Sequence, residues 1–275
     1  MLLKSLNLQN LIYDAYRKRQ EITIDQYLQN ILSQKQSSMA SYKVNNIINQ
    51  LRPYIIQWGN GFVDDIFQAG SSAKGTAIKG KSDCDVFISI KHSCVNPIEE
   101  VFDSLFSHLQ SWLGTSNVRK QNVSIGLNRP GYNVDLVPGK LQPGNTNYHW
   151  IYKSKSDTHT QTNVKGQVKY ICDSKRAPFI KLAKIWRDCH RLEFPSVNIE
   201  LAVIEAINGR SFNISLEKGF EIILNYFCEN LKSTRLVDPF NTNNVISDDM
   251  TIQEKLEVAK CAKDCLSKQW SNVVW

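Results

Sequence analysis

The stretch that decides the fold runs from residue 70 to residue 85 and reads Gly70-Ser-Ser-Ala-Lys-Gly-Thr-Ala-Ile-Lys-Gly-Lys-Ser-Asp-Cys-Asp85. It follows a run rich in β-branched and aromatic residues at 62–68 and leads into another at 84–90, and both runs predict strands. Gly70 lets the main chain approach a ligand closely, while Ser71 and Ser72 offer hydroxyl and amide groups. Such donors at the start of a helix suit the phosphates of a nucleotide.

Three aspartates in and beyond this stretch predict a metal site. Asp83 and Asp85 are two residues apart on a predicted strand, so both carboxylates lie on the same side and repel each other unless a cation lies between them. Asp135 lies in an apolar run, residues 131–138, that predicts a buried strand, where an unpaired carboxylate is costly. We therefore predict that Asp83, Asp85 and Asp135 are catalytic and hold two Mg²⁺ ions, for which Mn²⁺ can substitute, with Asp135 as general base or metal ligand.

Structural roles for the same residues stay open at this point. Asp83 and Asp85 would also suit an exposed strand with two solvated carboxylates. Asp135 would also suit a structural ion pair with Arg129 or Lys140. Ser71 would also suit a helix cap, a role that uses the same donors as phosphate binding.

The pattern around this stretch predicts an α+β fold. Helical spacing of apolar residues predicts helices before residue 58, over 101–113, and at 168–190, 196–207, 216–231 and 252–270. Besides 62–68 and 84–90, strands are predicted at 118–127 and 132–137.

Two lobes follow from that order of elements. We expect residues 1–155 to form N-terminal helices and a catalytic sheet, and residues 156–275 to form a helical lobe that closes over the nucleotide. The active site is expected in the cleft between them. The polar stretch 153–160 has no periodicity and marks the expected boundary.

The string G-S-S-x-K-G-T-x-x-x-G-x-S-D-x-D resembles the signature of a known superfamily. It is similar to the motif of 2′-5′-oligoadenylate synthetases and of bacterial cyclic-oligonucleotide synthases (CD-NTases), which are relatives of cyclic GMP-AMP synthase. All belong to the DNA-polymerase-β-like nucleotidyltransferases. The Asp-Pro…Asn-Asn pattern of residues 237–245 resembles a segment near the end of these enzymes, so the likeness extends from residue 70 to residue 245.

Further nucleotide-binding residues are implied by the resemblance alone. Residues 179–186 look like the helix that supplies a lysine to the donor triphosphate, which falls on Lys184, with Lys181 one turn earlier. Ser196 matches a serine that contacts the γ-phosphate. In several relatives an aromatic residue follows that serine and stacks on the base, whereas here Val197 follows, so base stacking must come from elsewhere. Without the resemblance, the lysines suit a solvated helix face and Ser196 a helix cap.

The composition of the chain limits the kinds of ligand and partner that we expect. The net charge of +7 favours anionic ligands, such as NTPs, but the basic residues are spread along the chain and do not form one dense nucleic-acid-binding run. No apolar run approaches the roughly 20 residues of a membrane span. Seven scattered cysteines suit reduced cytosolic thiols, and Cys261 and Cys265 could share a helix face but need further ligands for a zinc site. We expect a cytoplasmic protein with no membrane association.

Two candidate functions, which differ in the class of substrate, remain. The first, which we favour, is a template-independent synthase of a cyclic or short linear oligonucleotide second messenger. The resemblance implies NTP substrates with ATP among them, a product-sensing effector protein, no obligatory nucleic acid and a place in bacterial anti-phage defence. The second is a terminal nucleotidyltransferase acting on RNA, like CCA-adding enzymes, which needs more surface than this chain has left. A nucleotide-binding regulator is disfavoured because all three acids are present.

Overall fold

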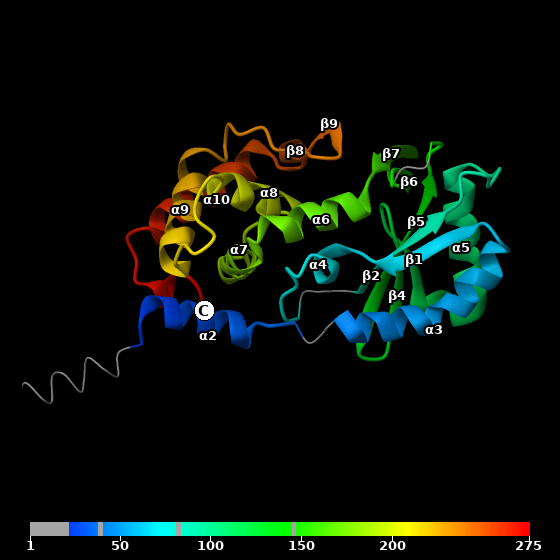
Figure 1. The fold of residues 1–275 in the computed structure, drawn as a ribbon, viewed down its shortest axis with the longest axis horizontal. Coiled ribbons are helices and arrows are strands. Elements are labelled where there is room, and N and C mark those ends of the chain that lie inside the picture. Colours follow the sequence, from blue (N-terminus) through cyan, green and yellow to red (C-terminus); the bar gives the residue numbers. More distant parts are fainter. Residues whose placement is uncertain (1–21, 38–40, 81–83, 145–146) are drawn as a thin grey trace, which may run out of the picture.

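The computed structural model describes residues 22–37, 41–80, 84–144 and 147–275, which form one seven-stranded mixed sheet, a two-stranded sheet and two groups of helices (Figure 1). The strands are β1 (Val63–Gln68), β2 (Cys84–Ile90), β3 (Val118–Lys120), β4 (Ile125–Arg129), β5 (Tyr132–Leu141), β6 (His149–Lys153), β7 (Thr158–Thr162), β8 (Val237–Asp238) and β9 (Asn241–Val245). The helices are α2 (Ile24–Gln34), α3 (Ser41–Gly59), α4 (Gly70–Ala73), α5 (Ile98–Leu113), α6 (Val164–Ser174), α7 (Ala177–Cys189), α8 (Ser196–Ala206), α9 (Leu216–Glu229) and α10 (Ile252–Cys265).

The sheet places two distant segments side by side. Its strand order is β1-β2-β5-β4-β3, and β6 and β7 extend it from β5. Strands β2 and β5 are parallel and every other neighbouring pair in this sheet is antiparallel. Residues opposite each other in such a ladder point to the same face, so the register of β2 on β5 decides which of their side chains meet.

Two hydrophobic cores lie side by side in the molecule. One fills the space between the sheet and helices α3 and α5. The other gathers α2 with α6 to α10, and includes Trp186, whose side chain is fully buried. Helix α2 comes early in the chain yet packs with the later helices, and the Tyr27 hydroxyl donates to the Val274 carbonyl at 2.7 Å (Figure 1).

The predicted α+β fold class is confirmed, and three details differ from the sequence prediction. Residues 118–127 form two antiparallel strands joined by a turn, not one strand. Residues 168–190 form two helices, because Lys175 adopts a left-handed conformation (φ 55°) and Pro178 starts the second helix. The polar stretch 153–160, which has no helical periodicity, contains the end of β6, the turn of the β6–β7 hairpin and the first part of β7.

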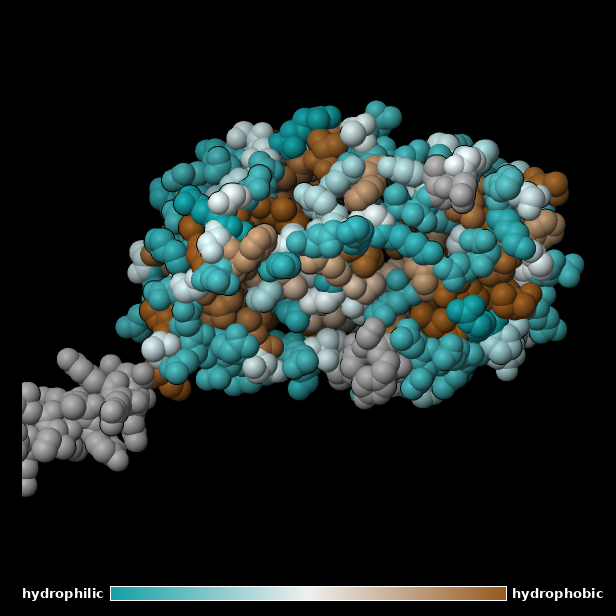
Figure 2. Space-filling model, in the orientation of Figure 1, coloured by the Kyte–Doolittle hydropathy of each residue, from teal (hydrophilic) through white to brown (hydrophobic). Residues whose placement is uncertain are grey.

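The division into lobes at residues 155 and 156 stays a prediction. Helix α2, before that point, packs with the later helices, and β7, after it, belongs to the sheet. The long helix α3 continues through Pro53. Within the described ranges, none of the helices combines the length and apolar character that crossing a membrane requires. Hydrophilic residues cover most of the face drawn in Figure 2, and hydrophobic residues form small separate patches on it.

A buried histidine makes stability depend on pH. His149 on β6 is 3% exposed, its Nδ1 lies 3.0 Å from the Asn147 carbonyl, and the Ser89 hydroxyl lies 2.9 Å from Nε2. A carbonyl only accepts, so Nδ1 carries hydrogen, and the single hydroxyl hydrogen of Ser89 lies within reach of both Nε2 and Asp64 Oδ2, to which Ser89 Oγ donates at 3.2 Å. Burial lowers the pKa of His149 below its ordinary value, although the Asn147 carbonyl and Asp64 oppose this.

We expect the free energy of unfolding to fall as the pH drops below the ordinary histidine pKa of 6.5 and toward the lower folded pKa of His149. In that window the unfolded chain binds a proton at His149 that the folded chain excludes. Urea unfolding at about pH 7.5 and about pH 5.5 should show a smaller loss for His149→Gln than for the wild type. The variant His159→Gln, at an exposed position on β7, should keep the wild-type pH dependence; equal losses in all three proteins would refute the prediction.

Candidate functional site

Two of the three predicted acids meet in the sheet. Asp85 on β2 pairs in register with Asp135 on β5, so both half-buried carboxylates project from the same face. Asp83 lies outside the described residues, and its role stays a prediction. Carboxylate oxygens at neighbouring positions are the donor set that Mg²⁺ and Mn²⁺ prefer, so the two acids fit the predicted metal site.

Asp135 is held by a residue that the sequence did not single out. The Gln121 side-chain amide donates to Asp135 Oδ1 at 2.9 Å, and the Ser124 hydroxyl donates to Gln121 Oε1 at 3.1 Å. Gln121 belongs to the turn between β3 and β4. The two cations that the sequence offered as structural partners lie elsewhere: Lys140 Nζ donates to the Asn96 carbonyl, and the Arg129 guanidinium lies over the Trp112 ring.

Gly70 is where the main chain comes closest to the acids. Its φ of +62° is left-handed, and a Cβ built on it would lie 1.8 Å from Asp85 Oδ2. The main chain is tied to the same strand, because the Ala69 amide donates to the Asp85 carbonyl at 2.8 Å. Only glycine leaves room for the Asp85 carboxylate here.

The loop after Gly70 begins with the single turn α4. Ser71 and Ser72 are half-buried within this turn, and Ser72 Oγ donates to the Ala69 carbonyl at 3.4 Å. The N-cap residue is Ala69, which makes no side-chain capping bond, so Ser71 is not the helix cap. Phosphate binding by Gly70, Ser71 and Ser72 stays a prediction, and α4 lies between the sheet and the helical group (Figure 1).

A buried ionic cluster joins this loop to the helical group. Glu200 on α8 is 3% exposed and accepts from Lys74 Nζ and Lys184 Nζ, both at 2.8 Å. Lys184 on α7 is 2% exposed and also donates to Thr76 Oγ1 at 3.0 Å. Lys74 and Thr76 come from the Gly70 loop, so one carboxylate ties both halves of the molecule together.

The pKa values in this cluster follow from burial and pairing. Burial lowers the pKa of Lys184 below its ordinary range, and the neighbouring Glu200 opposes that shift. Burial alone would raise the pKa of Glu200, but Lys74 and Lys184 outweigh it and hold that pKa below its ordinary value. Glu200 is therefore ionised at neutral pH. A triphosphate that used Lys184 would have to share its ammonium group with Glu200.

The other two residues implied by the resemblance lie apart from this cluster. Lys181, on α7, is half-buried, and its ammonium group forms neither a hydrogen bond nor an ion pair with any residue in the described ranges. Ser196 is exposed at the first position of α8, where its hydroxyl accepts from Arg187 Nη1 at 3.2 Å and makes no capping bond. Contact of Lys181, Lys184 and Ser196 with a nucleotide stays a prediction.

Known proteins match most of the chain. The model of the Second Messenger Oligonucleotide or Dinucleotide Synthetase domain matches residues 20–173, more than half of the 275 residues. The chain belongs to this synthetase family. It is 23% identical over 281 residues to the CBASS oligonucleotide cyclase CdnC of Escherichia coli strain KTE188, covering 90% of this chain and 88% of that protein. It is 25% identical over 202 residues to the cyclic AMP-AMP-AMP synthase of E. coli strain MS 115-1, covering 68% and 63%.

Solved structures show the same fold. CdnC of E. coli MS115-1 with ATP superposes with a TM-score of 0.75 at 18% identity, covering 92% of this chain and 98% of that one. The CD-NTase CdnG of Bradyrhizobium diazoefficiens with GTP gives 0.73 at 15% identity, covering 91% and 95%. The resemblance to polymerase-β-like CD-NTases is confirmed. The prediction that this protein is an enzyme, a nucleotidyltransferase of the cyclic oligonucleotide synthase type, is also confirmed.

The sequence did not single out three residues that the structure brings into the candidate site. Lys74 stands inside the motif and Glu200 lies four residues after Ser196, one helical turn away, so both were within segments already singled out. Gln121 comes from a turn between two short strands and carries no recognisable signal. Pairing between Lys184 and Glu200 could have been suspected only from the cost of burying a lysine on a core-facing position of α7.

Gly70→Ala tests whether activity depends on the close approach of the main chain to Asp85 and not on backbone strain. The added methyl group would displace the Asp85 carboxylate, and a shift of about 1 Å in a catalytic group costs about 10²-fold in rate. Gly61→Ala is the matched control, because Gly61 also has a positive φ (+88°) but nothing lies within 4 Å of its built Cβ. Melting temperatures should be similar for the two variants. Nucleotide turnover should be lost only in Gly70→Ala. Equal activities would disprove the steric role.

Proposed function

We propose that this protein joins NTPs, without a template, into a cyclic or short linear oligonucleotide second messenger, and that bacterial anti-phage signalling uses the product. The observation that carries the proposal is the in-register pair Asp85 and Asp135 beside the close approach of Gly70. Membership of the synthetase family supports it. The E. coli relative described with ATP, and the one named as a cyclic AMP-AMP-AMP synthase, support ATP as a substrate.

The chemistry follows from the residues around the acids. Asp83, Asp85 and Asp135 would hold two Mg²⁺ ions, which when bound supply a lowered pKa for the attacking hydroxyl and neutralise the leaving pyrophosphate. The 2′- or 3′-hydroxyl of one nucleotide attacks the α-phosphorus of another, and the bond to the β-phosphate oxygen breaks. Asp135, whose Oδ1 accepts a hydrogen bond from the Gln121 side-chain amide, would accept the hydroxyl proton. Amide groups of the Gly70 loop bind the phosphates.

In the proposed function, two aromatic residues near Lys74 contact the nucleotide base. Tyr170 on α6 and Phe240, between β8 and β9, lie edge to face with ring centroids 6.4 Å apart. Both line a recess that also includes Lys74, Glu200 and Val197. These rings offer the base-stacking surface that Val197 lacks.

A protein partner is part of the proposal. An E. coli CdnC relative is described in complex with a HORMA protein, which supports regulation by a bound protein. An effector that senses the product completes the proposed pathway. Nucleic acid is not required in this scheme.

The test incubates purified protein with the four labelled NTPs and Mg²⁺, without nucleic acid, and then with phosphatase. Phosphatase-resistant product that is absent with Asp85→Asn would support a template-free synthase and identify its bases. Labelling of added tRNA or another RNA, with no product from NTPs alone, would favour the terminal nucleotidyltransferase instead.

A further inference from the structure

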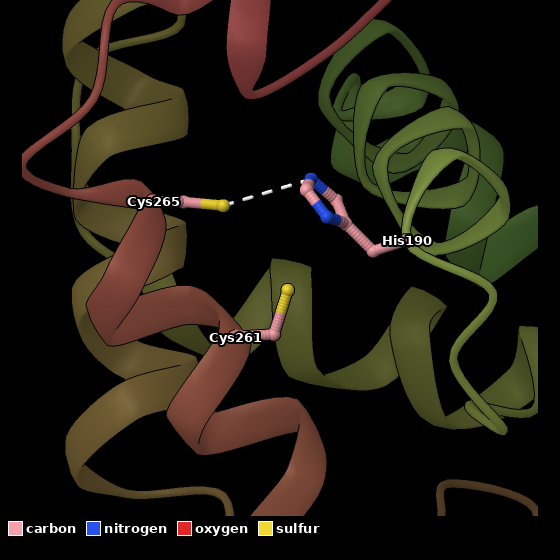
Figure 3. A group of neighbouring side chains, drawn as sticks. All are labelled: His190, Cys261 and Cys265. Atoms are coloured by element: carbon pink, nitrogen blue, oxygen red, sulfur yellow. Dashed lines mark hydrogen bonds between the residues drawn. The ribbon is translucent and has the colours of Figure 1, made fainter.

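A cysteine-histidine group lies in the helical half of the molecule, outside the site described above. Cys261 and Cys265 are one turn apart on α10, and His190 is the C-cap residue of α7. Their side chains point into one space between these helices (Figure 3). One ligand atom from each residue lies within 4.8 Å of the others, and no fourth His, Cys, Asp or Glu of the described ranges joins the group.

The spacing of these atoms suits a tetrahedral metal ion. With metal–sulfur and metal–nitrogen bonds of about 2.3 and 2.0 Å, a tetrahedral site separates sulfur from nitrogen by about 3.5 Å and two sulfurs by about 3.8 Å. Cys265 Sγ lies 3.6 Å from His190 Nε2, which meets the first of these separations. All three ligand atoms lie within 4.8 Å of one another, so shifts of about 1 Å would bring the remaining separations to these values.

The surroundings favour a thiolate at Cys265. The indole N–H of Trp186 donates to Cys265 Sγ at 3.5 Å, the kind of outer contact that orients and stabilises metal ligands. His190 Nε2 also lies 2.9 Å from the Val273 carbonyl, to which it donates when no metal is bound. Metal binding through Nε2 would move the ring hydrogen to Nδ1, and this carbonyl bond would be lost.

We propose that His190, Cys261 and Cys265 bind one Zn²⁺ ion, with water as the fourth ligand. Both thiols release their protons on binding, and the neutral imidazole contributes a lone pair. Two thiolates and one imidazole are the donor set that tetrahedral zinc takes in proteins. The ion fastens the end of α7 to α10, and next to it lies the Val273–Trp275 segment, where Trp275 packs edge to face on the His190 ring. The proposed role is to hold these two helices together, independent of the proposed synthase reaction, with a water position that closed four-ligand zinc sites lack.

Metal content of the full chain, purified without a histidine tag, tests the site. After incubation with one equivalent of Zn²⁺ and desalting, mass spectrometry should find about one zinc per chain. Cys261→Ser/Cys265→Ser and His190→Ala should each fall below about a tenth of that content. Cys228→Ser is the matched control, because Cys228 is also half-buried in the helical half but lies outside the group, and it should retain the metal.

Cobalt distinguishes this site from adventitious binding and needs only the wild-type chain. Co²⁺ in place of Zn²⁺ should produce thiolate-to-cobalt charge-transfer absorption and the intense visible bands of a tetrahedral ion, and one equivalent of Zn²⁺ should remove both. Three results would each overturn the proposal: background metal in the wild-type chain, zinc retained by the double cysteine variant, or a cobalt spectrum without charge transfer. The first and third need only the wild-type chain, so the test holds whether or not any variant folds.

Discussion

Asp135→Asn is expected to abolish nucleotide turnover and to leave the fold intact. Loss of a carboxylate that holds catalytic metal removes about 4 kcal/mol of transition-state stabilisation, which lowers the rate by about 10³-fold. Asp85→Asn should behave in the same way, because the two residues lie opposite each other on parallel strands. The melting temperature should be unchanged or raised, since an amide relieves repulsion between neighbouring carboxylates. Product formation from labelled NTPs and thermal melts measure both effects.

Asp103→Asn is the control for this experiment. It makes the same chemical change at an exposed carboxylate on α5 that pairs with Lys120, so activity should stay near that of the wild type. If Asp135→Asn or Asp85→Asn kept more than about a tenth of the wild-type rate, the two-metal assignment would be wrong.

Glu200→Gln is expected to cause a large loss of stability. The glutamine would leave Lys184, 2% exposed, without its charged partner, and breaking a buried ion pair from one side costs about 3–5 kcal/mol. Urea unfolding at neutral pH measures the free energy of unfolding. The folded pKa of Glu200 lies below its ordinary value, so its contribution is present above the ordinary pKa and is lost as the pH falls through the folded pKa. The difference between wild type and variant should therefore shrink in acid.

Glu221→Gln provides the comparison, because Glu221 pairs with Lys218 on the surface and its side chain is 43% exposed. This change should alter the free energy of unfolding by less than about 0.5 kcal/mol. A loss below about 1 kcal/mol for Glu200→Gln would show that the buried pair contributes little net stability.

The central part of the site could be predicted because it depends on local rules. Alternation along strands put Asp85 on a defined face of β2, and the apolar run around Asp135 marked a second strand. That the two strands are parallel neighbours in register could not be read from either segment alone. The opposition of Asp85 and Asp135 comes from long-range pairing that the motif resemblance implied but local pattern did not.

Other features escaped prediction for identifiable physical reasons. Strand β7 reads Thr-His-Thr-Gln-Thr and buries only Thr162, so this polar edge strand lacked the apolar pattern by which strands are predicted. The partner of Lys184 depends on how α7 packs against α8, which helical periodicity does not specify. His190 and Cys261 lie far apart in the sequence, so a two-cysteine helix face gave no sign of its third neighbour.

Because β2 pairs directly with β5, the positions of the two acids do not depend on the length of the loop that follows β2. Main-chain hydrogen bonds between these strands hold Asp85 beside Asp135, and of the intervening residues Gln121 contacts Asp135 while the loop 91–97 lies outside both strands. The loop between β2 and α5 can therefore accept added sequence, and Val95 within it is 86% exposed. A fluorescent or affinity peptide inserted beside Val95 would label the protein on a surface that the catalytic geometry does not depend on.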